Sequence, residues 1–144
     1  MRWALSLISS VLIVGCSSTQ PNQNDMQEHI SSDAVLFLRG DMTNWDALPE
    51  YKVQQTSTRV FSVKANLPEA GKTYHFKFAD AQWHPALNYG TAIDDAALSL
   101  NRPLPVRAYS YLDELRFTPE QAGTYEFMLD LRGRKPVALV KLAQ

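Results

Sequence analysis

Cysteine is almost absent from this sequence, because Cys16 is the only one among 144 residues. A disulfide within the sequence is therefore excluded, and so is a zinc site built from several cysteines. The three histidines, His29, His75 and His84, fall in regions that we expect to be a polar tail, a strand and a loop. The neighbouring acids Asp94 and Asp95 are typical of a solvated loop rather than of a calcium site. We therefore expect no metal site and no cofactor.

An excess of positive charge is also lacking. The chain has 14 Lys and Arg against 15 Asp and Glu, which gives a formal net charge of −1 and a pI near 6.3. Proteins that bind nucleic acid usually carry a basic stripe. The densest basic group, Arg132, Arg134 and Lys135, lies in an expected turn and is typical of a solvated loop. We therefore expect no nucleic-acid partner.

Motifs of known catalytic sites are missing as well. The sequence has no G-x-S-x-G, no H-E-x-x-H and no phosphate-binding glycine loop. A pair of catalytic carboxylates leaves no such motif, so glycosidase chemistry stays open as an alternative on sequence grounds. Nothing else in the pattern favours catalysis, and we expect the protein not to be an enzyme.

The first residues carry the one long apolar run, from Trp3 to Val14, which is too short to span a bilayer comfortably. Its length suits the apolar part of a secretory signal. The letters "IVGC" that end at Cys16 resemble a bacterial lipoprotein box. That resemblance implies a signal peptide over residues 1–15, cleavage before Cys16, and lipid on Cys16, including a diacylglycerol. Ser17 follows the cysteine in place of an aspartate, which by the same analogy implies the outer membrane of a bacterial cell.

An uncleaved membrane anchor with a chance cysteine remains the alternative to this lipoprotein interpretation. The residues that follow, 16–32, are rich in Ser, Asn and Gln and contain almost nothing to bury. Such a composition predicts a flexible tether between a membrane and a folded domain. We therefore place the folded domain at residues 33–144.

A period of two, typical of strands, recurs through this domain. In "KTYHFKFAD", Tyr74, Phe76 and Phe78 alternate with polar residues. Turn signals separate the apolar segments, and no long stretch has a helical period. This pattern predicts an all-β, immunoglobulin-like antiparallel β-sandwich. The expected strands are 34–40, 58–67, 72–80, 114–119, 123–131 and 135–142. Residues 83–109 are expected to form a long loop or a loosely paired segment, in which 93–100 holds one helical turn or a strand.

Two tryptophans and a lysine stand outside this alternation. Trp45 ends the turn of "FLRGDMTNW", Lys77 lies on the polar side of its strand, and Trp83 ends "FADAQW". An exposed indole with a hydrogen-bond donor beside it suits a sugar, whose C–H face packs on the ring while its hydroxyls need polar partners. The alternative for Trp45 is a structural plug at one end of the core. Tyr89, Tyr109 and Tyr111 are expected to pack or to anchor loops.

Three segments then carry a family resemblance: "VLFLRGDMTNWDALPEYKV", "RVFSVKANLPEAGKTYHFKFADAQW" and "AGTYEFMLDLRGRKPVALVKL". They resemble the family 48 carbohydrate-binding modules, which include the glycogen-binding domain of the AMP-activated protein kinase β subunit and the domains that precede pullulanase-type catalytic domains. The resemblance implies a non-catalytic sandwich that binds α-1,4-glucans such as glycogen or maltodextrin. It implies stacking by Trp45 and Trp83, donation to sugar hydroxyls by Lys77, and a hydroxyl contact by Asn88.

The sequence departs from the family pattern at two turns. Ala81 stands where a glycine is usual, and Thr43 stands where an asparagine or glycine is usual. Either change can alter the angle of the neighbouring ring. The resemblance therefore leaves a second function open, in which the sugar site has decayed and the same sandwich docks a protein partner in the cell envelope.

Overall fold

A computed structural model describes residues 34–144 of the chain. The expected signal peptide at 1–15, the expected tether at 16–32 and the expected lipidation site Cys16 lie outside the described residues. Within residues 34–144, no helix combines the length and the apolar character needed to cross a bilayer.

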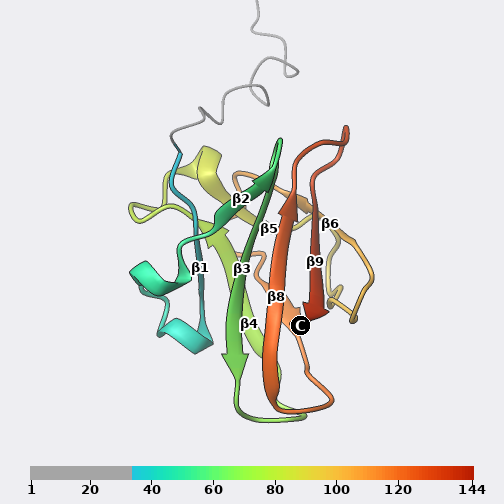
Figure 1. The fold of residues 1–144 in the computed structure, drawn as a ribbon. Helices are drawn as coiled ribbons and strands as arrows, with labels where there is room; N and C mark the ends of the chain where they lie inside the picture. Colours follow the sequence, from blue (N-terminus) through green and yellow to red (C-terminus); the bar gives the residue numbers. More distant parts are fainter. Residues whose placement is uncertain (1–33) are drawn as a thin grey trace, which may run out of the picture.

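Strands dominate the described chain (Figure 1). They are β1 (Phe37–Gly40), β2 (Gln54–Ser57), β3 (Val60–Leu67), β4 (Tyr74–Ala79), β5 (Asn88–Thr91), β6 (Leu104–Arg107), β7 (Leu115–Phe117), β8 (Gly123–Asp130) and β9 (Val137–Leu142). Three short 3₁₀ turns connect some of them: η2 (Asp41–Thr43), η3 (Pro49–Tyr51) and η4 (Pro85–Leu87).

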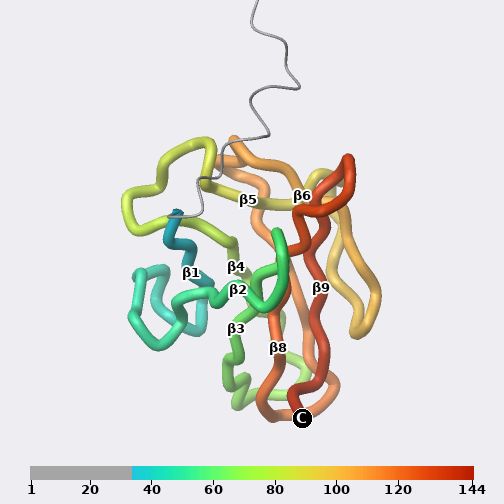
Figure 2. The backbone as a smooth tube through the Cα atoms, turned by 45° about the horizontal axis from the view of Figure 1, so that its top comes forward, coloured from blue at the N-terminus to red at the C-terminus, as the bar shows by residue number. Residues whose placement is uncertain are grey.

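The strands form one sheet that curls into two layers, in the order β1-β4-β5-β6-β9-β8-β3-β2, with β7 paired to β4. All named strand pairs are antiparallel. Figure 2 shows β5 and β6 crossing one end of the molecule, between the layer of β1 and β4 and the layer of β8 and β9. The predicted all-β antiparallel sandwich with an immunoglobulin-like build is confirmed.

The core lies between the two layers and is rich in aromatic rings. Phe76 of β4 meets Phe127 of β8 edge to face, with ring centroids 5.0 Å apart. Both side chains are fully buried, as is Phe78. The predicted alternation of β4 and β8 is the physical cause, because every second side chain points inward from each layer.

All six predicted strands are present, and three further strands were not predicted. The edge strand β2 has only exposed residues and no apolar alternation. Strands β5 and β6 fall inside the segment predicted as a long loop or a loosely paired segment. β5 contains Gly90 and β6 contains Pro105, which weaken a strand pattern. Their pairing closes the sheet from one layer to the other. Within 93–100, the structure has turns and isolated bridges, such as Leu98 with Phe117.

The contact of β1 with β4 depends on a glycine. Gly40 pairs with Phe76 across the two strands. A Cβ added at Gly40 would lie 2.6 Å from the Phe76 Cβ, well inside van der Waals contact. A larger residue would therefore push the end of β1 away from β4, and with it the turn η2 that leads to Trp45.

Candidate functional site

The candidate site lies on the outer side of β1 and β4, where Arg39 pairs with Lys77. Two loops fold back over this pair: residues 41–46 after β1, and residues 80–84 after β4. Trp45 comes from the first loop and Trp83 from the second. The antiparallel pairing of β1 and β4 thus brings together two tryptophans that are 38 positions apart in the sequence (83 − 45).

The two indoles lie close and at an angle. Their ring centroids are 6.4 Å apart and their planes are tilted by 37°. Both side chains are half-buried. Both residues have left-handed backbones, with φ of 64° at Trp45 and 59° at Trp83. A bulky residue in this region costs on the order of 1–3 kcal/mol, so the surrounding structure must impose these conformations.

Arg39 supplies much of that constraint, and sequence reasoning missed it. Its Nε donates to the Trp45 carbonyl oxygen at 2.8 Å. One terminal nitrogen donates to the carbonyl oxygens of Asp80 and Ala81, at 2.9 and 3.1 Å. Its Cζ lies 3.6 Å from the centroid of the Trp83 ring, a cation–π contact. Arg39 therefore ties both tryptophan loops to β1.

The guanidinium of Arg39 is buried, with 7% of the residue exposed. Burial lowers its pKa, and the nearby carboxylates of Asp46 and Asp80 oppose that shift. A guanidinium keeps its charge in proteins, so the group stays a cation with its donors directed at the loops.

A second cation, Lys77, lies beside Arg39 and is 2% exposed. Its Nζ donates to Asn88 Oδ1 at 3.1 Å and to the Ser110 carbonyl oxygen. Burial lowers the pKa of Lys77, while Asp113 and Glu114 oppose the shift. An ammonium has three donors, so these two bonds leave one for a ligand. Sequence reasoning expected Lys77 on the polar side of β4 but not its burial under the loop at 108–114.

That loop brings two further residues to the site. A hollow of about 310 Å³ is lined by Trp45, Lys77, Trp83, Asn88, Tyr111 and Glu114. We call it the aromatic hollow. The four residues predicted from the sequence therefore lie together. Tyr111, which was expected to pack or to anchor a loop, is 66% exposed and lines the hollow.

The sequence offered little signal for the residues that were missed. Arg39 and Glu114 are charged residues on outward positions of strands or loops, which usually means a solvated surface. Only the register of β1 on β4 and the path of the loop at 108–114 bring them to the site. Tyr89, by contrast, is 5% exposed and packs in the core as predicted.

Asp80 and His84 hold the turn that carries Trp83. The His84 amide donates to Asp80 Oδ1 at 2.8 Å, and its ring Nδ1 also meets the Asp80 carboxylate. Asp80 is 5% exposed. Ala81 lies within this turn and does not have a left-handed backbone, so the turn forms without a glycine there. Among residues 34–144, no group of three or more His, Cys, Asp or Glu side chains is placed to hold a metal ion.

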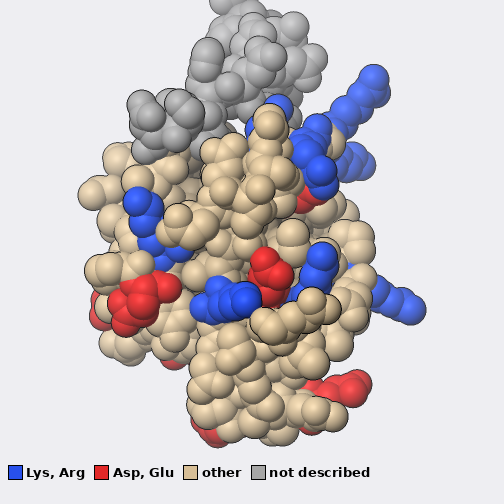
Figure 3. Space-filling model, viewed as in Figure 1, with Lys and Arg blue, Asp and Glu red and all other residues tan. Residues whose placement is uncertain are grey.

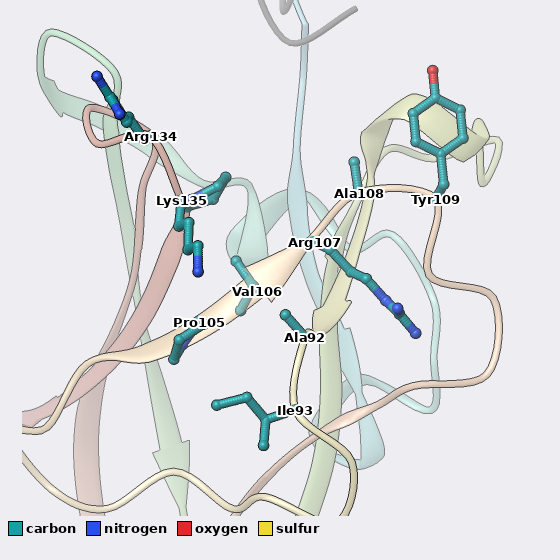
Figure 4. A pocket seen from close by; sticks show the side chains of 10 residues that line it. Ala92, Ile93, Pro105, Val106, Arg107, Ala108, Tyr109, Arg134 and Lys135 are labelled. Atoms are coloured by element: carbon teal, nitrogen blue, oxygen red, sulfur yellow. The ribbon is translucent and has the colours of Figure 1, made fainter. Parts of the chain in front are cut away.

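A larger hollow of about 520 Å³ lies elsewhere, between β6 and the turn from β8 to β9 (Figure 4). Aliphatic side chains such as Ile93 and Val106 form much of its wall, and the Tyr109 ring and Arg134 point away from its centre. It therefore offers no flat aromatic face. Lys and Arg side chains gather around the same turn, as Figure 3 shows. Arg132 there pairs with Asp130 at 2.6 Å, which fits the predicted solvated turn.

Comparison with known proteins relates the chain to a solved structure. No family model and no curated protein matches the sequence. A solved chain described as "Ligand induced structure of AmyP-SBD", a starch-binding domain, superposes with a TM-score of 0.56 at 16% identity. The alignment covers 96% of this chain and 97% of that chain. The chain thus shares the β-sandwich fold of that domain.

Proposed function

We propose that this domain binds α-1,4-glucan chains without cleaving them, through the aromatic hollow. The observation that carries the proposal is the pair Trp45 and Trp83, which are half-buried, 6.4 Å apart and tilted by 37°. Successive glucose units in an α-1,4-linked chain also turn relative to each other. Two tilted rings can therefore each take the C–H face of a different sugar.

Polar groups around the two rings match the hydroxyls of such a chain. Lys77 has a donor left, and Asn88, Tyr111 and Glu114 line the same hollow. Water competes for every hydroxyl, so a site of this kind gains most from stacking and from preorganisation. The bonds of Arg39 to both loops provide that preorganisation.

Two comparisons support the proposal from outside the site. The AmyP-SBD structure shares the fold across nearly the whole chain. The sequence also resembles the family 48 modules at Trp45, Lys77 and Trp83. Glycogen and maltodextrin are the glucans that this resemblance favours. Both tryptophans also have left-handed backbones, a kind of strain that is often found at binding sites.

Calorimetric titration with maltoheptaose tests the proposal. Trp45→Ala and Trp83→Ala should each weaken binding by at least about tenfold, because each removes a stacking ring. Tyr109→Ala is the matched control: it removes an aromatic side chain that is 50% exposed but does not line the aromatic hollow. Its affinity should stay within about twofold of the unsubstituted protein. Absence of binding at millimolar sugar in a folded protein would refute glucan binding.

A second candidate function is docking of a protein partner in the envelope. Leu112 is 90% exposed beside Tyr111, which is 66% exposed, and two adjacent exposed apolar side chains could contact a partner. A Leu112→Ser variant should then lose the partner in a pull-down and keep its glucan affinity. The unsubstituted protein must first be tested for glucan binding. If it binds none, and a Trp45→Ala, Trp83→Ala double variant loses a protein partner, the result favours docking alone.

The lipoprotein proposal rests on the sequence. Lipid on Cys16 would hold the domain at the outer membrane, since each buried methylene adds about 0.8 kcal/mol. The polar residues 17–32 would give the sandwich reach along the membrane surface. Cys16→Ser should abolish incorporation of labelled palmitate and move the protein from the membrane fraction. Unchanged labelling in that variant would refute the assignment.

A further inference from the structure

A second, polar hollow adjoins the aromatic hollow. It has a volume of about 400 Å³, and its lining includes His75, Asp94, Asp113, Glu114 and Arg116. Glu114 also lines the aromatic hollow, so the two hollows meet at its side chain. We call the second one the polar hollow.

The outer face of β4 runs under both hollows. His75 lines the polar hollow and Lys77 lines the aromatic hollow. These two residues are neighbours on one face of the strand, about 7 Å apart along it. On the next strand, Arg116 of β7 pairs with His75. The two hollows therefore follow one another along a continuous face of the sheet.

The polar hollow has the groups that sugar hydroxyls need. One carboxylate oxygen of Glu114 lies 3.0 Å from His75 Nδ1, and the other accepts no hydrogen bond from residues 34–144. The closest carboxylate contact of Arg116 is a loose one, with Asp95 at 4.0 Å, and its side chain is one-third exposed. A guanidinium and a carboxylate can each bond two neighbouring hydroxyls at once.

The polar hollow lacks a large ring for stacking, because no phenylalanine, tyrosine or tryptophan lines it. Hydrogen bonds to hydroxyls alone give little net affinity in water. The polar hollow is therefore suited to hold the continuation of a chain that the tryptophans already bind, and not a separate sugar.

We propose that a glucan bound on Trp45 and Trp83 continues past Glu114 into the polar hollow, where Arg116 and Asp94 bond its hydroxyls. This inference rests on the proposed function and adds to it a selection for chain length. A short oligosaccharide fills the aromatic hollow only, and a longer one fills both.

The ratio of the affinities for maltoheptaose and maltotriose, measured by calorimetry on the full chain, tests the extension. Statistics alone favour the longer sugar by roughly fivefold, since a three-unit stretch fits it in about five registers. Two added hydrogen bonds contribute about a further tenfold, so we expect a ratio of roughly fifty.

Arg116→Met and Asp94→Asn together should return that ratio to about fivefold and leave maltotriose affinity within about twofold. Asp94→Asn alone, a change in an exposed loop that cannot disturb the core, should lower the ratio by about threefold. Lys135→Met, in the larger hollow of Figure 4, is the matched control and should leave the ratio near fifty.

The outcomes separate this inference from the proposed function. A ratio near five in the unsubstituted protein, or a high ratio that both variants retain, overturns the extension and leaves glucan binding intact. Loss of maltotriose binding in Asp94→Asn also overturns it, because the residue would then belong to the aromatic hollow. No binding of either sugar overturns both proposals.

Discussion

The two layers of the sandwich differ in how they use their outer surfaces. Strands β3 and β8 pair without a break over eight residues, from Val60 with Asp130 to Leu67 with Gly123. Side chains alternate between more and less buried along β8 from Thr124 to Asp130, and along β3 from Val63 to Leu67. The layer of β1 and β4 instead buries two cations, Arg39 and Lys77, on its outer side under loops.

Burying these cations and holding these loops lowers the free energy of unfolding. Removing a charge from water is unfavourable unless partners replace the lost hydration. The partners of Arg39 are backbone carbonyls of the two loops that present the tryptophans. Both tryptophans also have strained backbones. The difference indicates that the β3–β8 layer provides stability, whereas the β1–β4 layer gives up some stability to fix a surface.

The largest effect on stability should come from the core that joins the layers. Phe127→Ala removes a fully buried ring that meets Phe76 edge to face. We expect a loss of about 3–5 kcal/mol in the free energy of unfolding, measured by urea denaturation. The fraction that remains folded should bind maltoheptaose normally. A folded but non-binding variant would mean that the layers are not separable in this way.

The second-largest effect on stability should come from Arg39→Met, which should also weaken binding. It leaves three carbonyl oxygens without their donor, which costs about 1–3 kcal/mol. Glucan affinity should fall at least about tenfold as the tryptophan loops lose their position. Indole emission should shift to the red before any sugar is added, because Trp83 loses its cover. Arg39→Lys should not restore binding, since an ammonium cannot reach both loops.

Normal indole emission and unchanged affinity in Arg39→Met would contradict this positioning role. A variant that binds normally but unfolds more easily would leave Arg39 as a purely structural residue. Arg39 would then have no role in glucan binding.

Lys77→Met should change the pH dependence of stability. Burial lowers the pKa of Lys77 in the folded state below its value in the unfolded chain. Between these two values the unfolded state binds more protons, so folding becomes more favourable as pH rises through this window. The unsubstituted protein should show this gain relative to Lys77→Met in urea denaturation at a series of alkaline pH values. Parallel profiles would mean that burial does not penalise the ammonium.

The smallest effect should come from Tyr111→Ala at the edge of the aromatic hollow. Its side chain is largely exposed, so stability should change by less than about 0.5 kcal/mol. Maltoheptaose affinity should fall by about twofold to tenfold if the ring touches sugar. Tyr111→Phe separates the ring from its hydroxyl in the same titration. Equal affinities for all three proteins would remove Tyr111 from the site.

Much of the β3–β8 layer could be predicted from the sequence, because alternation is a local property. Tyr125, Phe127 and Leu129 are readable as one face of a strand without knowing their partners. Strands β5 and β6 could not be predicted in this way, because their burial comes from crossing between the layers.

The residues of the candidate site also differ in whether the sequence alone could predict their role. Trp45 and Trp83 stand out because large aromatic rings in polar turns need an explanation. The role of Arg39 depends on its pairing with Lys77 across two strands and on loops that fold back over both. Neither the pairing nor the left-handed backbones of the tryptophans can be recognised from the amino-acid sequence.

The central claim is that Trp45 and Trp83 together bind one glucan chain. Nitrogen–proton correlation spectra of the indole N–H groups, recorded as maltoheptaose is added, test this most directly. Trp45→Phe and Trp83→Phe assign the two signals. The account predicts that both signals move along one saturable curve with the same dissociation constant. A curve in which neither signal moves, or in which only one of them does, would contradict it.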